Sequence, residues 1–195
     1  MNIVIIDYGA GNIKSIQFAI RRLGYNAILS NNTSLIQQAD KVIFPGVGHA
    51  NSAMKKLKDS KLDQIIPNLT QPVLGICLGM QLMCKYTEEG AVDGLGIFPI
   101  SVYRFPQKSK IPHTGWNTIE KLRSPLFNSI QEKEYTYFVH SFYAPISDFT
   151  IAQTEYIIPF SAALQKGNFL ATQFHPEKSS SPGERILSNF LNLNK

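Results

Sequence analysis

The first part of the chain alternates short apolar runs with amphipathic stretches. Apolar runs of strand length occupy residues 2–6, 27–29, 41–44 and 73–76. Between them, apolar residues recur at helical spacing over residues 13–23, 33–38, 49–57 and 62–69. Another helix is predicted to begin after the fourth strand and to include residues 80–85. Strands that alternate with helices in this way predict a parallel sheet with helices on both faces.

The second part has a different pattern, in which short strand candidates are separated by turn residues. These candidates lie at residues 94–105, 116–119, 135–139, 142–144, 150–152, 161–164 and 169–172. Such spacing is typical of antiparallel strands, and an amphipathic stretch over residues 183–193 predicts a final helix. We therefore expect an α/β fold with a mixed, mostly parallel sheet, helices on both faces and a small added antiparallel sheet. A single domain over residues 1–195 is expected to contain all of it.

Composition narrows the classes of function and partner. The 195 residues are 44% hydrophobic and 17% charged, with a formal net charge of +5, which is ordinary for a globular protein. Basic residues cluster only briefly, at residues 55–58 and 108–110, so nucleic acid is not an expected partner. No apolar run approaches the length that crosses a membrane, so a membrane is not expected either. The N-terminus lacks the pattern of a signal peptide.

The two cysteines, Cys77 and Cys84, are too few for a disulfide framework. If a helix begins between them, their separation along its axis is roughly 10 Å, which is too far for a bridge. We therefore expect reduced thiols and a cytoplasmic location.

Cys77 lies in the motif Gly75-Ile76-Cys77-Leu78-Gly79, between an apolar strand and the start of a helix. A sharp strand-to-helix turn needs neighbours with almost no side chain, and a glycine on each side meets that need. Such a turn lifts the Cys77 side chain clear of the sheet and sets it at a helix N-terminus, where the helix dipole favours a thiolate. We interpret Cys77 as a nucleophile; a buried structural cysteine is the alternative.

A cysteine nucleophile needs a base within hydrogen-bond reach and a third group that orients the base. Among four histidines, His175 directly follows the last strand candidate and precedes Pro176 and Glu177. In extended chain, Glu177 would project on the same side as His175 and hold the imidazole in its productive tautomer. Because active sites of open α/β sheets gather at the carboxyl ends of the strands, Cys77, His175 and Glu177 form a coherent candidate triad.

The tetrahedral intermediate of such a reaction needs hydrogen-bond donors for its oxyanion. The backbone amide of Leu78, directly after the nucleophile, is the first candidate donor. Gly46, Val47 and Gly48 follow the third strand and can present a second amide, because glycine lets a peptide adopt unusual orientations. A plain turn after the strand is the alternative for that segment.

Three other interpretations account for fewer residues. Residues 9–14 lack the third glycine of a dinucleotide-binding motif, and no acidic residue follows the second strand. His175 and Glu177 match half of a zinc-deaminase motif, but the Pro-Cys-x-x-Cys ligand pair is missing. A scaffold or redox-sensing module with Cys77 as an exposed thiol is the non-enzymatic alternative. No metal and no cofactor are expected.

The segment from Gly75 to Gln81, together with Phe174-His175-Pro176-Glu177, resembles the class I (triad) glutamine amidotransferases. A narrower resemblance, to the glutaminase subunits of imidazole glycerol phosphate synthases, is carried by Asp7-Tyr8-Gly9-Ala10-Gly11-Asn12, Pro45-Gly46-Val47-Gly48, Pro112-His113-Thr114-Gly115-Trp116-Asn117 and Phe138-Val139-His140-Ser141-Phe142-Tyr143. This resemblance implies a three-layer flavodoxin-like fold and hydrolysis of L-glutamine to glutamate and ammonia. The ammonia would pass to the cyclase subunit of a heterodimer, which makes imidazole glycerol phosphate and aminoimidazole carboxamide ribotide in histidine biosynthesis.

The resemblance also implies a role for individual residues of the catalytic centre. Cys77 would be the nucleophile, His175 the general base and acid, and Glu177 the orienting carboxylate. The oxyanion hole would be formed by Leu78, Gly46, Val47 and Gly48.

The remaining implied roles concern substrate and partner. Gln81 and Glu89 would hold the α-amino and carboxylate end of glutamine, helped by the backbone around Ser141 and Phe142. The residues that would face the cyclase are Asn12, Trp116 and Lys166. The same chemistry could instead supply ammonia to a different synthase, such as a sugar amidation enzyme, and the sequence leaves that alternative open.

Overall fold

The computed structural model describes residues 1–9 and 11–193. The chain begins with β1 (Ile3–Ile6), α1 (Ile13–Arg22), β2 (Ala27–Ser30), α2 (Thr33–Gln38), β3 (Lys41–Phe44), α3 (Ala50–Asp59), α4 (Leu62–Ile65), the 3-10 helix η1 (Ile66–Asn68), β4 (Val73–Ile76) and α5 (Leu78–Met83). It continues with β5 (Cys84–Thr87), β6 (Val92–Asp93), β7 (Phe98–Arg104), β8 (His113–Ile119), η2 (Pro125–Phe127), β9 (Glu134–His140), β10 (Phe142–Tyr143), β11 (Thr150–Tyr156), β12 (Ile158–Lys166), β13 (Phe169–Thr172), η3 (Pro176–Lys178) and α6 (Ser180–Asn192).

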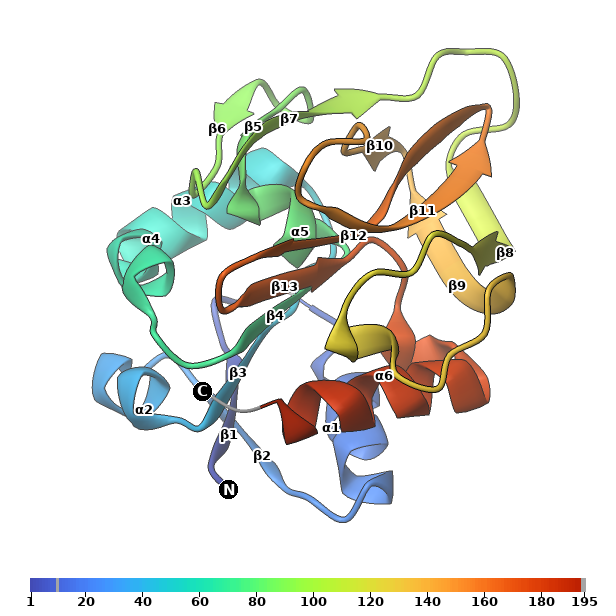
Figure 1. Cartoon of the computed structure of the whole chain (residues 1–195). Coiled ribbons are helices and arrows are strands. Elements are labelled where there is room, and N and C mark those ends of the chain that lie inside the picture. The colour runs from blue at the N-terminus through green and yellow to red at the C-terminus, as the bar shows by residue number, and fades with distance from the viewer. Residues whose placement is uncertain (10, 194–195) are drawn as a thin grey trace.

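A seven-stranded sheet forms the centre of the fold, in the order β11-β12-β13-β4-β3-β1-β2 (Figure 1). The strands from β13 to β2 are parallel to one another, and β12 and β11 extend the sheet in antiparallel fashion. Because parallel strands end at the same edge, the loops after β1, β3, β4 and β13 meet there. Cys77 and His175, far apart in sequence, follow the adjacent strands β4 and β13.

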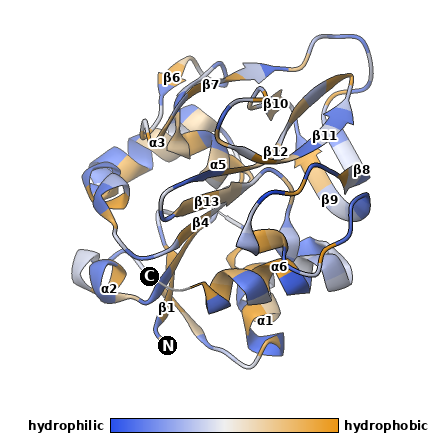
Figure 2. Cartoon of the chain, in the orientation of Figure 1, coloured by the Kyte–Doolittle hydropathy of each residue, from blue (hydrophilic) through white to orange (hydrophobic). Residues whose placement is uncertain are grey.

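Alternate residues of the central strands enter two apolar layers. On β1, Val4 and Ile6 join the layer under α2, α3, α4 and α5, whereas Ile3 and Ile5 join the layer under α1 and α6 (Figure 1). The strands β1, β3, β4 and β13 are buried along their whole length. Figure 2 shows the apolar central strands and the hydrophilic outer faces of the helices. Burial on both faces explains why these strands are continuous apolar runs in the sequence rather than alternating ones.

Two smaller sheets come from the middle of the chain, one in the order β10-β7-β5-β6 and one made of β8 and β9. Strands β8 and β9 are antiparallel, from the pair His113–His140 to the pair Ile119–Glu134. In the four-stranded sheet, β5 and β7 are parallel and the other neighbours antiparallel. The predicted mixed sheet, with helices on both faces and a small antiparallel addition, is confirmed. In the part of the chain that the structure describes, no helix is long and apolar enough to cross a membrane.

The prediction of a helix through residues 80–85 is wrong at its end. Helix α5 stops at Met83, and Cys84 begins β5 by pairing with Phe98 of β7. Hydrogen bonds to a strand later in the chain therefore override the local helical pattern, as tertiary context often does. Cys77 and Cys84 are both free thiols.

Candidate active site

The turn between β4 and α5 places Cys77 at the carboxyl edge of the central sheet. Cys77 has φ +54° and ψ −108°, a conformation that costs a residue with a side chain on the order of 1–3 kcal/mol. A Cβ added to Gly75 would come within 2.8 Å of the Met83 sulfur, and one on Gly79 within 2.1 Å of the Phe44 carbonyl oxygen. The predicted sharp turn with obligatory glycine neighbours is therefore confirmed.

The segment after β3, residues 45–48, packs directly on the turn between β4 and α5. A Cβ added to Gly46 would lie 2.5 Å from the backbone nitrogen of Gly79, so only glycine permits this approach. The Tyr8 hydroxyl donates a hydrogen bond to the Pro45 carbonyl at 2.7 Å and fixes the start of the segment. Gly48, near its end, has φ +99°, in the region that favours glycine. The residues predicted to supply the second oxyanion donor thus lie beside Cys77.

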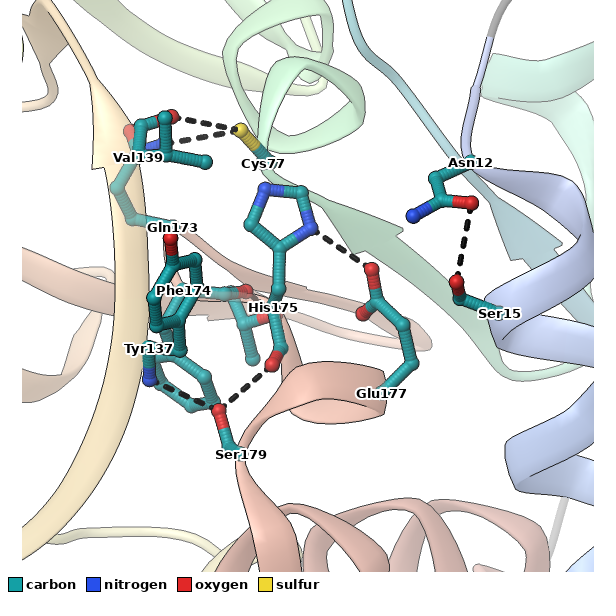
Figure 3. Close-up of polar contacts among 11 residues, drawn as sticks. Asn12, Ser15, Cys77, Tyr137, Val139, Gln173, Phe174, His175, Glu177 and Ser179 are labelled. Carbon is teal, nitrogen blue, oxygen red and sulfur yellow. Dashed lines mark hydrogen bonds and ion pairs between the residues drawn. The ribbon is translucent and has the colours of Figure 1, made fainter. Parts of the chain in front are cut away.

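His175 and Glu177 lie where the chain leaves β13 and enters the 3-10 helix η3. The backbone of His175 is extended, as predicted, but that of Glu177 belongs to the 3-10 helix, so the prediction of extended chain is wrong at Glu177. The tight helical turn nevertheless brings Glu177 Oε1 to 2.8 Å from His175 Nδ1, and the two side chains are only 2% and 1% exposed. The Ser179 hydroxyl donates to the His175 carbonyl at 2.6 Å and accepts from the Tyr137 amide at 2.9 Å (Figure 3). The predicted contact between His175 and Glu177 is present, held by a different backbone.

The imidazole of His175 lies between Cys77 and the Glu177 carboxylate (Figure 3). Burial lowers the pKa of His175, but its interactions with Cys77 and Glu177 outweigh burial and raise that pKa to about 10. The Nε2 atom of His175 is buried and has no hydrogen-bond partner in the part of the chain that the structure describes. We therefore attribute the effect of Cys77 to proximity and charge rather than to a formed hydrogen bond. His175 carries a proton at neutral pH, beside the candidate nucleophile.

A cavity of about 300 Å³ opens over Cys77, a size that suits a small-molecule ligand. Its lining contains Val47, Gly48, Cys77, Leu78, Gln81, Glu89, Pro112, Val139, His140, Ser141, Phe142 and His175. The structure thus brings together the predicted nucleophile, base and substrate-binding residues. A larger hollow of about 450 Å³ shares only Val47 and Gly48 with this cavity and contains no member of the triad. The smaller cavity is the candidate site, because it holds the reactive groups.

Gln81 lines the cavity, and both hydrogens of its side-chain nitrogen are already used in hydrogen bonds within the protein. Its Nε2 donates to the Phe142 carbonyl and to Gln173 Oε1, both at 3.0 Å. Gln173 is fully buried and directs its own Nε2 toward the Cys77 sulfur at 3.8 Å. Gln81 therefore offers a ligand its side-chain oxygen, an acceptor that suits an ammonium group. Gln173 is not predicted as a site residue by the sequence, where its only signal is its position two residues before His175.

Glu89 connects the cavity wall to helix α3. Its carboxylate accepts a hydrogen bond from the Ala50 amide at 2.9 Å, in the first turn of α3, where a negative charge is favoured. This bond joins the loop after β5 to the far end of the segment that packs on Cys77. Glu89 thereby places a carboxylate in the cavity wall.

The three residues predicted to face a partner are not all at one edge of the sheet. Asn12 follows β1, at the same edge as Cys77, and its side-chain oxygen accepts from the Ser15 hydroxyl at 3.0 Å (Figure 3). Lys166 pairs with Phe169, the first residue of β13, and so lies at the opposite edge. The Lys166 ammonium donates to a backbone carbonyl, that of Ile97, at 2.7 Å.

Trp116 lies on β8 with 52% of its surface exposed and packs edge-on against Tyr137 of β9, at 5.9 Å between ring centroids. A different lysine, the exposed Lys178, has its Nζ 5.9 Å from the centroid of the same Tyr137 ring. Trp116 and Lys178 therefore both lie beside the Tyr137 ring. Lys178 is not predicted for this cluster by the sequence, because nothing in the sequence shows that Tyr137 of β9 contacts both Trp116 and Lys178.

Cys77 and His175 lie in the wall of one cavity, and the Glu177 carboxylate contacts His175. A cysteine, a histidine and a carboxylate in this arrangement are the groups that acyl transfer from an amide requires. Among the residues that the structure describes, no cluster of three or more His, Cys, Asp or Glu side chains could hold a metal ion.

Comparisons with known proteins agree with this chemistry. Residues 4–193 match the family described as glutamine amidotransferase class-I. The chain is 58% identical to imidazole glycerol phosphate synthase subunit HisH of Bacteroides thetaiotaomicron, over 99% of this chain and 100% of that protein. It is 48% identical to the protein of the same name in Vibrio cholerae, over 98% of each. A solved structure described as a glutamine amidotransferase has the same fold, with a TM-score of 0.75 at 17% identity over 96% of each chain.

The chain therefore belongs to the class-I glutamine amidotransferase family, enzymes that release ammonia from glutamine. Within that family, its similarity over the whole chain is to the HisH subunits of imidazole glycerol phosphate synthase.

Proposed function

We propose that the chain is the glutaminase subunit of an imidazole glycerol phosphate synthase. It hydrolyses L-glutamine, and the ammonia passes to a cyclase subunit that makes imidazole glycerol phosphate and aminoimidazole carboxamide ribotide in histidine biosynthesis. The observation that carries the proposal is the 2.8 Å contact of His175 with Glu177, next to the cavity that also contains Cys77. The similarity to HisH proteins over the whole chain supports the choice of partner. The two free thiols fit a cytoplasmic location.

The first step is attack of the Cys77 sulfur on the side-chain amide carbon of glutamine. The new S–C bond gives a tetrahedral intermediate, whose oxyanion accepts hydrogen bonds from the Leu78 amide and from an amide of residues 46–48. Fixed backbone donors are effective because they need no reorganisation during the reaction. The tight packing of Gly46 on Gly79 supports this role, since it keeps the two donor segments together.

His175 transfers the proton in this mechanism. Because its pKa is raised to about 10, the imidazole holds the proton of the thiol and gives it to the leaving nitrogen as the C–N bond breaks. Water then attacks the carbonyl carbon of the resulting thioester and gives a proton to His175. The S–C bond breaks, which releases glutamate and restores the Cys77 thiolate beside the protonated His175. Glu177 is the positioning residue that keeps Nδ1 protonated and the ring oriented.

The amino-acid end of glutamine is held at the other end of the cavity. The Gln81 side-chain oxygen and the Glu89 carboxylate accept from the α-ammonium group, because both are acceptors in the cavity wall. The backbone of Ser141 and Phe142 holds the α-carboxylate. This arrangement orients the substrate amide toward Cys77, and orientation of this kind contributes much of the rate.

Ammonia must be kept from bulk water, so the partner covers the edge of the sheet that carries Cys77. Asn12 and Trp116 are the residues of this face that we propose for the interface, and Lys178, the neighbour of Trp116 around Tyr137, joins them. Lys166 is not included, since it pairs with the first residue of β13, at the far edge.

The assignment of Cys77 is tested by the pair of variants Cys77→Ala and Cys84→Ala in the complex with a cyclase subunit. Removal of a nucleophile lowers turnover by more than about 10 000-fold, so Cys77→Ala is expected to abolish measurable glutamate release. Cys84→Ala removes the other buried thiol, which donates only to the Met80 carbonyl, and is expected to retain most of the activity. Unchanged glutamate release by Cys77→Ala would show that the catalytic assignment is wrong.

A further inference from the structure

Two buried histidines, His113 and His140, belong to motifs that the triad does not use. His113 Nδ1 and His140 Nε2 are 3.0 Å apart, at the first pair of the β8–β9 ladder. The two residues are 4% and 6% exposed. They are packed among the aromatic rings of Phe105, Phe138, Tyr156 and Phe160. In such surroundings polar groups are stable only when they are hydrogen-bonded, so the direction of each bond matters.

The hydrogen bonds of this pair have only one consistent direction. His140 Nδ1 lies 2.8 Å from the Phe142 carbonyl oxygen, which can only accept, so Nδ1 carries the hydrogen. Burial lowers the pKa of His140 to about 3 and that of His113 to about 4, so both rings are neutral at pH 7. His140 Nε2 is then an acceptor, and His113 Nδ1 must donate to it. His113 Nε2 accepts in turn from the side-chain nitrogen of Asn117 at 3.4 Å.

This chain of hydrogen bonds ends at the substrate cavity. The Phe142 carbonyl accepts from His140 and also from Gln81 Nε2 at 3.0 Å. The second hydrogen of Gln81 goes to Gln173, which approaches the Cys77 sulfur. The position of the Phe142 carbonyl therefore determines where Gln81 lies in the cavity wall, and His140 determines the position of that carbonyl.

We propose that His113 and His140 are positioning residues for glutamine. As a pair with hydrogen on both Nδ1 atoms, they hold the Phe142 peptide and the Gln81 side chain in the geometry that binds the amino-acid end of the substrate. The inference rests on the glutaminase function proposed above. It adds that substrate affinity depends on two histidines that take no part in the bond-making steps.

The hydrogen positions are tested on the unaltered protein by nitrogen-15 NMR of its histidine rings near pH 7. His113 and His140 are expected to show hydrogen on Nδ1 and none on Nε2, whereas the exposed His49 serves as an internal reference. The variants His113→Asn and His140→Asn assign the signals. A hydrogen on Nε2 of either ring would overturn the inference, because the chain of bonds could not then run to Phe142.

The positioning role is tested by glutamine kinetics in the complex with a cyclase subunit. His140→Leu removes the donor to Phe142, and we expect KM for glutamine to rise about tenfold while kcat changes less than about threefold, as loss of a buried hydrogen bond predicts. His140→Asn places a side-chain nitrogen near the position of Nδ1 and is expected to restore KM to within about threefold of the wild-type value.

Phe105→Leu is the matched control, because the Phe105 ring packs 5.4 Å from that of His140 without a hydrogen bond. If the role of His140 were only to fill space, His140→Leu and Phe105→Leu would raise KM alike and His140→Asn would not restore it. That result, or an unchanged KM in His140→Leu, would overturn the inference while the wild-type complex still released glutamate. If the wild-type complex released none, the proposed function would fail first. The NMR result describes the unaltered protein and decides the hydrogen-bond pattern independently of KM.

Discussion

At the scale of single residues, the role that we propose for Glu177 is to act on the reacting sulfur only through His175. Its Oε1 accepts from His175 Nδ1, and its Oε2 is buried without a partner. A neutral amide in the same place can present a hydrogen where the imidazole needs an acceptor, and it removes the charge that keeps the ring protonated. We therefore expect the carboxylate to be needed for the chemical step and not for binding glutamine.

Glu177→Gln is expected to lower kcat for glutamate release by about 1000- to 10 000-fold, as neutralising the carboxylate of a catalytic triad does, with little change in KM. Glu184→Gln is the matched control, since Glu184 is partly exposed and pairs with Arg22 on the surface. Initial rates in the cyclase complex measure both variants. Activity of Glu177→Gln within about tenfold of the wild type would show that Glu177 does not orient a catalytic base.

The sequence predicts the triad residues because their constraints are local. Two glycines flank Cys77, and Glu177 is only two residues from His175. The contacts of Gln173 and Lys178 could not be predicted in the same way, because each depends on a strand or helix far away in the chain. The place of Lys166 in the sheet could not be predicted for the same reason, since only the pairing of β12 with β13 shows at which edge it lies.

At the scale of elements, the turn into α5 and the end of β3 constrain each other. The Cα of Gly79 faces the Phe44 carbonyl, and that of Gly46 faces the backbone of Gly79. Neither backbone can yield without moving a strand of the central sheet or the segment predicted to form the oxyanion hole. One methyl group at Gly79 is therefore a strong perturbation of both stability and activity.

Gly79→Ala is expected to lower the free energy of unfolding by about 3 kcal/mol or more, because overpacking against backbone has no side chain to absorb it. Gly167→Ala is the control: its Cβ meets nothing within 4 Å, and its φ of +58° costs an L-residue only about 1–2 kcal/mol. Urea denaturation compares the two. Equal losses would show that the turn and the end of β3 are not tightly packed.

The helices and strands of the first part of the chain could be predicted because the central strands are buried on both faces and are interrupted by clear helical patterns. The end of α5 could not, because Cys84 joins β5 only through its pairing with Phe98. The small strand β6 gave no local signal for the same reason: it is two residues long and depends on β5.

At the scale of the whole molecule, buried histidines make stability depend on pH. The pKa values of His113 and His140 lie below the ordinary 6.5, at about 4 and about 3, so the unfolded chain binds protons that the folded one cannot. The free energy of unfolding should fall by about 2 kcal/mol per histidine between about pH 6.5 and about pH 5. His175 has the opposite sign: its contribution is complete below pH 6.5 and is lost as pH rises through about 10.

Urea denaturation at several pH values measures this dependence. The double variant His113→Asn/His140→Asn should be less stable at neutral pH and should lose much less stability on acidification. A wild-type protein whose free energy of unfolding is flat between about pH 6.5 and about pH 5 would contradict the burial of these rings as neutral groups.

At the same scale, we propose that one edge of the molecule, with Cys77, Asn12 and the Trp116–Tyr137–Lys178 cluster, faces the partner that receives ammonia. The most direct test of this account measures glutamate release by the purified chain alone, with a cyclase subunit and its nucleotide, and with an unrelated ammonia-using synthase such as a sugar amidation enzyme. We expect strong stimulation by the cyclase and none by the unrelated synthase. Stimulation by the unrelated synthase, with none by the cyclase, would contradict the proposed function.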